Sequence, residues 1–448
     1  MSCEPQATRH KLSNARGSWL VAHGSTGHLR HVLSVFSFLL SASLFAQEIP
    51  SVKAQAKQYV DTLASPAFFG RGYVQGGDSL AADWIAKQFD RIGLDKLNGT
   101  RYERFSFPVN IFPDSIGFRV DGRTLSPGED FLVDPASGTS DGEFDLVHVK
   151  LEDLLTPERK AMTFGVVQGH AAVLHFPPTT NGDTLQLYRA LENELARYVP
   201  VIRPGGKKLT WSVAGTPARN AILELRDGLL PDSARHAAIR VYNSFIPRHQ
   251  ARNVWGVAKG KGKDWLLVTA HYDHLGMMGQ ALFPGANDNA SGVGMLLSLA
   301  EWFKKHPAKC NILFVAFAGE EAGLKGSEWF VVDRPMDFSR IKMVINLDLN
   351  GTGEEGITVV NATQQKEVFD KLVAINTKTQ ALPQVKARGP ACNSDHCPFV
   401  EKGIPAIFIY TMGGVSWYHD VHDRAETLPL TKFDELYRTL VALIGPLK

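Results

Sequence analysis

The stretch Leu266–Gly292, LLVTAHYDHLGMMGQALFPGANDNASG, is the most informative part of the chain. Its apolar run Leu266–Ala270 is of strand type and ends abruptly at His271 and Asp273; Asp288 follows after a glycine-rich loop. Polar side chains at the end of a buried strand occupy the usual position of an α/β active site. Imidazole and carboxylate groups are common zinc ligands. The stretch therefore predicts a buried strand that delivers metal ligands.

Three later stretches repeat this pattern, because each places an acidic or imidazole side chain after an apolar run. Glu320 and Glu321 follow one run, Asp348 ends the next, and His419 lies in an aromatic-flanked loop near the C-terminus. Neighbouring carboxylates at a strand end favour two roles, one as a metal ligand and one as a free base that activates a metal-bound water. We interpret the four stretches together as one metal site.

Two of the aspartates in the first stretch have specialised roles open to them. Asp273 can orient the His271 ring from behind instead of binding a metal itself. Asp288 lies in a loop before a helix, where a carboxylate can bridge two cations. A single His or Asp at a strand end is more often a hydrogen-bonded loop residue than a ligand. Five ligand-type positions after consecutive strands favour a metal site over a solvated surface.

The composition is that of an ordinary folded protein of more than one domain. The chain has 448 residues, of which 44% are hydrophobic and 21% charged. The net charge of +2 gives no argument for nucleic acid or for an anionic membrane surface. Four cysteines are too few for a disulfide scaffold. Cys392 and Cys397 flank one short loop, where they form a disulfide in an oxidising compartment or remain two free thiols.

The N-terminus predicts export. Its apolar run Val32–Phe45 is too short to span a bilayer comfortably and suits the core of a signal peptide that ends at Ala46. The leader before this run is unusually long, so an alternative is a true start further along the chain; a buried helix or a mobile tail is another. We expect a secreted or periplasmic protein with no membrane span in the mature chain.

The rest of the chain divides into three parts. Residues 47–115 contain two segments of helical spacing with a glycine-rich turn between them. Residues 236–448 alternate apolar strands with amphipathic helices, which is typical of an α/β sheet covered on both faces. The last of these helices is predicted from Thr431, with Asp434 in capping-box position. Residues 116–235 contain short β-like runs and turns, and predict an inserted, mostly β domain or lid; the alternative is a long decorated loop.

Six motifs carry a family resemblance. In chain order they are AHYDHLG, GANDNASG, AGEEAGLKGS, NLDLNG, SDHCPF and WYHDVHDRAETL. They resemble the successive motifs of the bacterial leucyl aminopeptidase family of co-catalytic di-zinc exopeptidases, whose broader family includes glutaminyl cyclases and glutamate carboxypeptidase II. The match covers about residues 58–95 and 250–430. It implies a mixed, mostly parallel central sheet with helices on both faces, and a region 116–235 loosely like a protease-associated domain.

The resemblance also implies two zinc ions and a role for each ligand-type residue. His422 lies three residues after His419 and makes the C-terminal ligand ambiguous, but the family pattern of an aromatic residue, a histidine and an aspartate four residues later fits His419 and Asp423. The implied roles are zinc binding by His271 and Asp348, zinc binding by Glu321 and His419, bridging by Asp288, general base catalysis by Glu320, orientation of His271 by Asp273, and a pocket wall at Ser394, Asp395 and His396, with Asp395 structural.

These observations predict a zinc-dependent exopeptidase, an aminopeptidase that removes N-terminal residues from peptides. The alternatives on the same fold are a glutaminyl cyclase, a carboxypeptidase and a receptor-like protein without metal. The loop GANDNASG favours a peptidase over a cyclase, and the intact ligand set argues against a receptor-like protein. Side-chain preference and oligomeric state are not predicted.

The sequence gives weaker indications about the substrate pocket. No cluster of arginines accompanies the metal motifs, as recognition of a substrate carboxylate would favour, and Arg388 and Arg424 are the nearest in sequence. Apolar and aromatic residues near the motifs could form a pocket floor or could be core packing. They are Met277, Met278, Phe283, Phe399, Trp417 and Tyr418.

Overall fold

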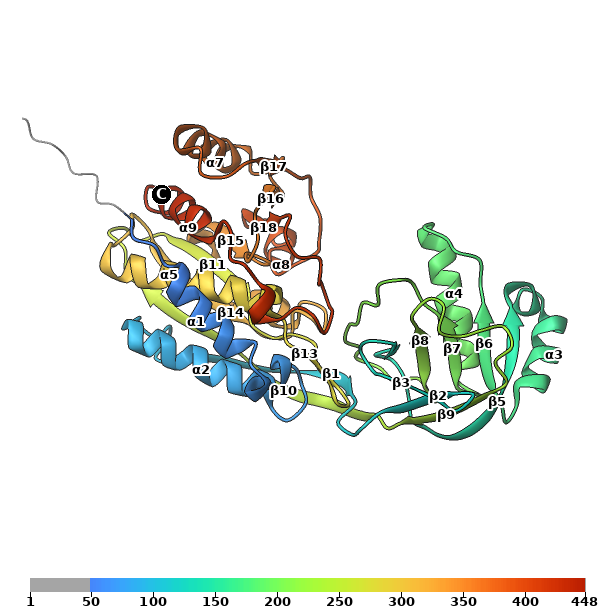
Figure 1. Cartoon of the computed structure of the whole chain (residues 1–448). Helices are drawn as coiled ribbons and strands as arrows, with labels where there is room; N and C mark the ends of the chain where they lie inside the picture. Colours follow the sequence, from blue (N-terminus) through green and yellow to red (C-terminus); the bar gives the residue numbers. More distant parts are fainter. Residues whose placement is uncertain (1–48, 448) are drawn as a thin grey trace, which may run out of the picture. The chain divides into compact units, whose positions relative to one another are not determined.

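The main sheet has eight strands, and its central four, β14, β11, β15 and β18, run parallel (Figure 1). The computed structural model describes residues 49–447, so the predicted signal peptide lies outside the described residues. The prediction of a mixed, mostly parallel sheet is confirmed. In spatial order the strands are β1 (Tyr102–Ile111), β10 (Ser244–Ala258), β14 (Asn311–Phe317), β11 (Trp265–His271), β15 (Ile341–Leu347), β18 (Ala406–Met412), β16 (Gly356–Val360) and β17 (Val385–Ala387).

Helices cover both faces of this sheet, because its central strands are apolar on both sides. In β14, Ile312 and Phe314 join one hydrophobic cluster, whereas Leu313 and Val315 join another on the opposite face. No helix within residues 49–447 is long and apolar enough to cross a bilayer. The first cluster includes residues of α1 (Lys53–Leu63), α2 (Gly77–Ile92), α5 (Gly292–Lys305), α7 (Lys366–Thr379) and α9 (Phe433–Ile444), and the second includes residues of α6 (Lys325–Asp333) and α8 (Cys397–Glu401).

A second sheet of eight strands lies between β1 and β10 in the sequence. The region is rich in β-structure, as predicted, but it also contains two helices that the sequence prediction did not include, α3 (Pro157–Val167) and α4 (Gly182–Leu195). The division of the chain into domains stays a prediction. In spatial order the strands are β3 (Arg123–Leu125), β2 (Gly117–Val120), β9 (His236–Val241), β5 (Ser140–Lys150), β6 (Ala171–His175), β7 (Val201–Pro204), β8 (Ile222–Leu225) and β4 (Phe131–Val133).

The predicted capping box at the start of the last helix is wrong. The helix α9 begins at Phe433, and its N-terminus receives no side-chain cap. Asp434 instead accepts hydrogen bonds from the backbone N–H groups of Val52 (2.8 Å) and Lys53 (3.0 Å) at the start of α1. A carboxylate satisfies free N–H groups at any helix N-terminus within reach, and here the nearest one belongs to the first helix of the described chain.

A buried arginine, Arg71, holds the loop that precedes α5. Its side chain is inaccessible to solvent and uses all five of its N–H groups as donors to backbone carbonyls. Burial lowers the pKa of Arg71 to about 10, while the negative charges of nearby carboxylates, Asp423 first, oppose the shift, so the side chain is charged at neutral pH. The acceptors are the carbonyls of Tyr272, Leu63, Pro284, Gly285 and Asp288, at 2.7–3.1 Å.

A buried aspartate, Asp423, holds the same loop through its N–H groups. The carboxylate of Asp423 accepts from the backbone of Asn287 (2.8 Å) and Asp288 (2.9 Å), and its carbonyl accepts from Ala286 (3.0 Å). The carbonyls of this loop therefore face a cation and its N–H groups face an anion. Both buried charges stabilise one backbone conformation around Asp288.

Replacing Arg71 tests this arrangement. We expect Arg71→Lys to lower the free energy of unfolding by at least about 3 kcal/mol, because an ammonium cannot reach five diverging carbonyls and each buried polar group left unpaired costs about 1–3 kcal/mol. Guanidinium denaturation measures the change. Arg119→Lys is the matched control, since Arg119 is an exposed partner of Glu143 and should change stability by less than about 1 kcal/mol. Equal effects would contradict the assignment.

Candidate metal centre

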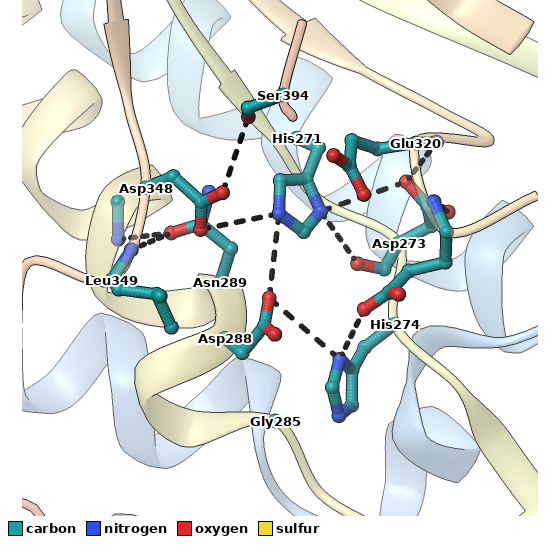
Figure 2. Close-up of polar contacts among 12 residues, drawn as sticks. His271, Asp273, His274, Gly285, Asp288, Asn289, Glu320, Asp348, Leu349 and Ser394 are labelled. Carbon is teal, nitrogen blue, oxygen red and sulfur yellow. Dashed lines mark hydrogen bonds and ion pairs between the residues drawn. The ribbon is translucent and has the colours of Figure 1, made fainter. Parts of the chain in front are cut away.

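Five predicted ligand residues from separate segments converge at the carboxyl ends of the central strands. His271 ends β11, Glu321 follows β14 and Asp348 follows β15. Asp288 lies in the short helical turn before α5, and His419 lies in the loop after β18. The carboxyl ends of parallel strands meet at one edge of the sheet, and the side chains therefore meet there too. Figure 2 shows the His271 ring beside Asp288 and Asp348.

The ligand atoms form two groups that share Asp288. In the His271 half-site (His271, Asp348 and Asp288), His271 Nε2 lies 3.3 Å from Asp348 Oδ1 and 3.4 Å from Asp288 Oδ1. In the His419 half-site (His419, Glu321 and Asp288), His419 Nε2 lies 3.2 Å from Glu321 Oε2 and 3.3 Å from Asp288 Oδ2. Asp288 therefore presents one carboxylate oxygen to each half-site.

These separations fit zinc. Ligand atoms around a tetrahedral zinc ion with bonds of about 2.0–2.1 Å lie about 3.3 Å apart. The oxygen Asp348 Oδ1 is buried and makes no hydrogen bond within residues 49–447, although His271 Nε2 is 3.3 Å away. A buried carboxylate oxygen without a hydrogen-bond donor is costly unless a cation balances it. Imidazole nitrogens and carboxylate oxygens that lie this close together without a hydrogen bond between them are compatible with a metal ion bound between them.

The adjacent glutamates Glu320 and Glu321 have different surroundings. Glu320 lines the cavity described below, whereas Glu321 faces His274 and His419. Burial raises the pKa of Glu320 well above its usual range. Burial also acts to raise the pKa of Glu321, but the charge of His419 and the hydrogen bonds from His274 and His419 outweigh it and lower the pKa to about 2. The two carboxylates therefore differ in position and in the direction of their pKa shifts.

Asp273 contacts the site differently from the prediction. His271 Nδ1 lies 3.1 Å from the carbonyl of Asp273, whereas its distance to the carboxylate is 3.9 Å. The carboxylate accepts hydrogen bonds from the hydroxyl of Tyr73 (2.6 Å) and from the backbone N–H groups of Glu320 (3.2 Å) and Glu321 (3.3 Å). Asp273 thus positions the histidine through its backbone and the glutamate pair through its side chain.

Sequence reasoning missed His274. Its ring is fully buried, and Nδ1 lies 2.8 Å from Glu321 Oε1 (Figure 2). The backbone of Gly285 passes directly beside this ring. A Cβ atom on Gly285 would lie 2.4 Å from His274 Cδ2, and its φ of +62° also favours glycine. The motif AHYDHLG contains this histidine, but only the fold shows that it contacts Glu321.

The SDHCPF motif forms one wall of the site. Ser394 Oγ lies 3.2 Å from Asp348 Oδ2. Asp395 is fully buried and accepts from Ser327 Oγ at 2.6 Å, outside both half-sites, which matches the structural role implied for it. The structure pairs Cys392 with Cys397, whose Cα atoms lie 4.9 Å apart. The disulfide closes the short loop that carries this wall.

The structure separates the two candidate C-terminal histidines. His419 lies beside Glu321 and Asp288 in the His419 half-site. His422 Nε2 lies 3.2 Å from Glu129, an acidic residue that belongs to neither half-site. Of the two, His419 is therefore the one placed to bind a metal.

A cavity of about 180 Å³ opens over the ligands. Of the six residues considered for its floor, Tyr418 lines it; Met278, Phe283 and Phe399 are core residues. Phe408 and Tyr410 were missed, although alternate residues of a strand share a face. The lining consists of His271, Asp288, Glu320, Asp348, Leu349, Arg388, Asn393, Phe408, Tyr410, Tyr418 and His419.

Arg388 is the one arginine of the cavity lining. It is exposed, follows β17, and makes no side-chain hydrogen bond or ion pair with other residues between 49 and 447. Its backbone is fixed, because its N–H donates to Val359 and its carbonyl accepts from Ala362. In the sequence, Arg388 is only near the metal motifs, whereas in the fold it lines the cavity.

Comparisons with known proteins agree with the resemblance. The model of Peptidase family M28 matches residues 253–444. Aminopeptidase YwaD of Bacillus subtilis (strain 168) is 27% identical over 361 residues, which cover 76% of this chain and 73% of that protein. A probable leucine aminopeptidase of Arthroderma otae (strain ATCC MYA-4605 / CBS 113480) is 31% identical over 215 residues, which cover 44% of this chain and 56% of that protein.

Solved structures share the fold. BSAP, a zinc aminopeptidase from Bacillus subtilis, superposes with a TM-score of 0.66 at 20% identity, covering 89% of this chain and 95% of that one. An aminopeptidase from Aneurinibacillus sp. strain AM-1 gives a TM-score of 0.61 at 20% identity, covering 88% and 94%. The match of residues 253–444 to Peptidase family M28, together with the similarity to aminopeptidases, supports a hydrolase that acts on peptide bonds.

Proposed function

We propose that the protein is an aminopeptidase that uses two zinc ions to hydrolyse N-terminal residues from peptides. The observation that carries this proposal is the position of Asp288, whose two oxygens face different histidines at 3.3–3.4 Å. One carboxylate that serves two sets of ligands is the arrangement expected of a bridging ligand in a two-metal site. The similarity to proteins named as aminopeptidases supports the choice of reaction.

The residues divide between the two metals as the half-sites do. His271 and Asp348 would hold one zinc, Glu321 and His419 the other, with Asp288 shared. Zinc bound there supplies Lewis acidity toward a peptide carbonyl and toward water. Ser394, His274 and the backbone of Asp273 contact the ligands and fix their orientation.

Glu320 is the proposed general base. It lines the cavity beside His271 and Asp288, whereas Glu321 contacts two histidines and does not line the cavity. From this position Glu320 would take the proton from water during attack on the scissile carbonyl and deliver it to the leaving amine. The carboxylate of Asp273 accepts hydrogen bonds from the backbone N–H groups of both glutamates, and these bonds fix the position of the base relative to the ligand.

The size of the cavity supports an exopeptidase. A cavity of about 180 Å³ is smaller than the roughly 300–1,000 Å³ typical of drug-sized ligands, so it suits a single residue. Three carboxylates, those of Asp288, Glu320 and Asp348, line it together with one arginine.

Separate substitutions of the adjacent glutamates test the assignment of roles. We expect Glu320→Gln to retain both metals and to lose at least about 10²-fold in kcat, because only the proton transfer is removed. Glu321→Ala should lose zinc together with activity. Metal analysis and kcat measure the two effects, and Glu328→Gln, in an exposed ion pair on α6, is the control. A metal-free Glu320→Gln protein beside a loaded Glu321→Ala protein would reverse the assignment.

A carboxypeptidase is the second candidate function, and Arg388 is the observation that favours it. An unpaired guanidinium at the cavity can bind a substrate carboxylate. The named relatives favour an aminopeptidase. A glutaminyl cyclase remains the third possibility on this fold.

Peptides with one end blocked distinguish these candidates. For an aminopeptidase we expect N-acetylation to abolish turnover, because acetylation removes the positive charge of the α-amine that the enzyme recognises. Amidation of the C-terminus should change turnover little. Apolar N-terminal residues should be preferred. The assay compares kcat/KM for the free, acetylated and amidated forms of one peptide with zinc present. Cleavage that survives acetylation and fails on amidation would identify a carboxypeptidase, and pyroglutamate formed from an N-terminal glutamine without cleavage would identify a cyclase.

We also propose that the protein is secreted or periplasmic. The apolar run Val32–Phe45 supports this, and so does the Cys392–Cys397 disulfide, since disulfides persist mainly in oxidising compartments. N-terminal sequencing of protein from the native host should find a mature chain that begins near Gln47. An intact chain that begins at Met1 in the cytosol would contradict the proposal.

A further inference from the structure

The region of the second sheet makes a direct contact with one proposed metal ligand. Trp211 lies between β7 and β8, and two hydrogen bonds join it to His419. His419 Nδ1 lies 2.8 Å from the carbonyl of Trp211, and the backbone N–H of Trp211 donates to the carbonyl of His419 at 3.2 Å. Nearby, Lys208 Nζ donates to the carbonyl of Ser416 at 2.6 Å. The two segments are 208 positions apart in sequence.

The contact fixes the state of the imidazole that a metal needs. A carbonyl oxygen can only accept a hydrogen bond, so Nδ1 of His419 carries the hydrogen. In the neutral ring the lone pair then belongs to Nε2, the atom that faces Glu321 and Asp288 at 3.2 and 3.3 Å. A partner on the second ring nitrogen also sets the orientation of the ring.

Contacts from both sides hold Trp211 itself. The indole is buried and stacks on Phe283 of β13 (Ala281–Phe283), with ring centres 4.7 Å apart. Its Nε1 donates to the carbonyl of Val133 in β4 of the second sheet at 2.8 Å. The carbonyl that meets His419 is therefore anchored to the second sheet and to the hairpin that follows β11.

The backbone of His419 needs such support. Its φ is +55°, in the left-handed region that only a few per cent of non-glycine residues occupy, although histidine is enriched among them. The paired hydrogen bonds to Trp211 hold both the backbone and the ring. In the His271 half-site, by contrast, His271 Nδ1 contacts the carbonyl of Asp273, only two residues away. The two half-sites thus obtain their orientation from different parts of the chain.

We propose that Trp211 is a positioning residue of the metal centre, and that the region of the second sheet thereby prepares the His419 half-site for zinc. This inference rests on the proposed zinc centre. Under this proposal, the region between β1 and β10 orients a ligand of the His419 half-site. Zinc binding at the His271 half-site does not depend on that region.

The experiment compares the zinc affinities of variants by chelator competition, with activity as a second readout. We expect Trp211→Ala to weaken one of two zinc sites by about 10–100-fold and to leave the other unchanged, as is typical when a partner of a ligating histidine is lost. Trp211→Phe retains an aromatic ring against Phe283 and should restore most of the affinity. Lys208→Ala, which changes a partly exposed contact beside the same loop, should weaken the same site several-fold without disturbing the core.

Phe131→Ala is the matched control, because Phe131 is a fully buried aromatic residue of the same hydrophobic cluster and its ring packs on Phe118. It should leave both zinc affinities unchanged. Equal losses in Trp211→Ala and Phe131→Ala, or unchanged zinc affinities in both Trp211→Ala and Lys208→Ala, would overturn the inference while the proposed function stands. A wild-type protein that binds no zinc would overturn both.

Discussion

The candidate metal centre depends on two buried charges that hold one loop. The carbonyls around Asp288 face the guanidinium of Arg71, and the N–H groups of the same loop face the carboxylate of Asp423. A buried charge is tolerated when its hydrogen bonds are complete, and here Arg71 uses every donor that it has. The loop in turn fixes the carboxylate of Asp288, which joins the two half-sites. Without this pair of charges, the shared ligand would have no defined position.

The sequence could predict the parts of this site that follow directly from strand ends. Apolar runs such as that before His271 predict buried parallel strands, and the polar residue after each run then falls at the same edge of the sheet. Arg71 and Trp211 could not be found in this way, because each acts on residues about 200 positions away. The same limit explains the error at Asp434, whose local pattern predicts a cap for its own helix while the fold offers it another helix start.

The two half-sites differ in how they are built. The His271 half-site comes from the central strands, and its histidine contacts the carbonyl of a residue two positions away. The His419 half-site combines a residue after β14 with a loop that touches the region of the second sheet. Strand ends therefore place His271, Asp348 and Glu321. Tertiary contacts between distant segments place Asp288 and His419. This difference explains why the sequence motifs predict the candidate ligands but no role for the region between β1 and β10.

The contact of Asp434 with α1 has a consequence for the order of assembly during synthesis. The helix α1 is the first element of the described chain to leave the ribosome, and its free N–H groups are satisfied by a side chain that is made more than 380 positions later. Arg438 of the same last helix also donates to the carbonyl of Ile49. In a nascent chain, water must therefore satisfy these N–H groups until the last helix has been made.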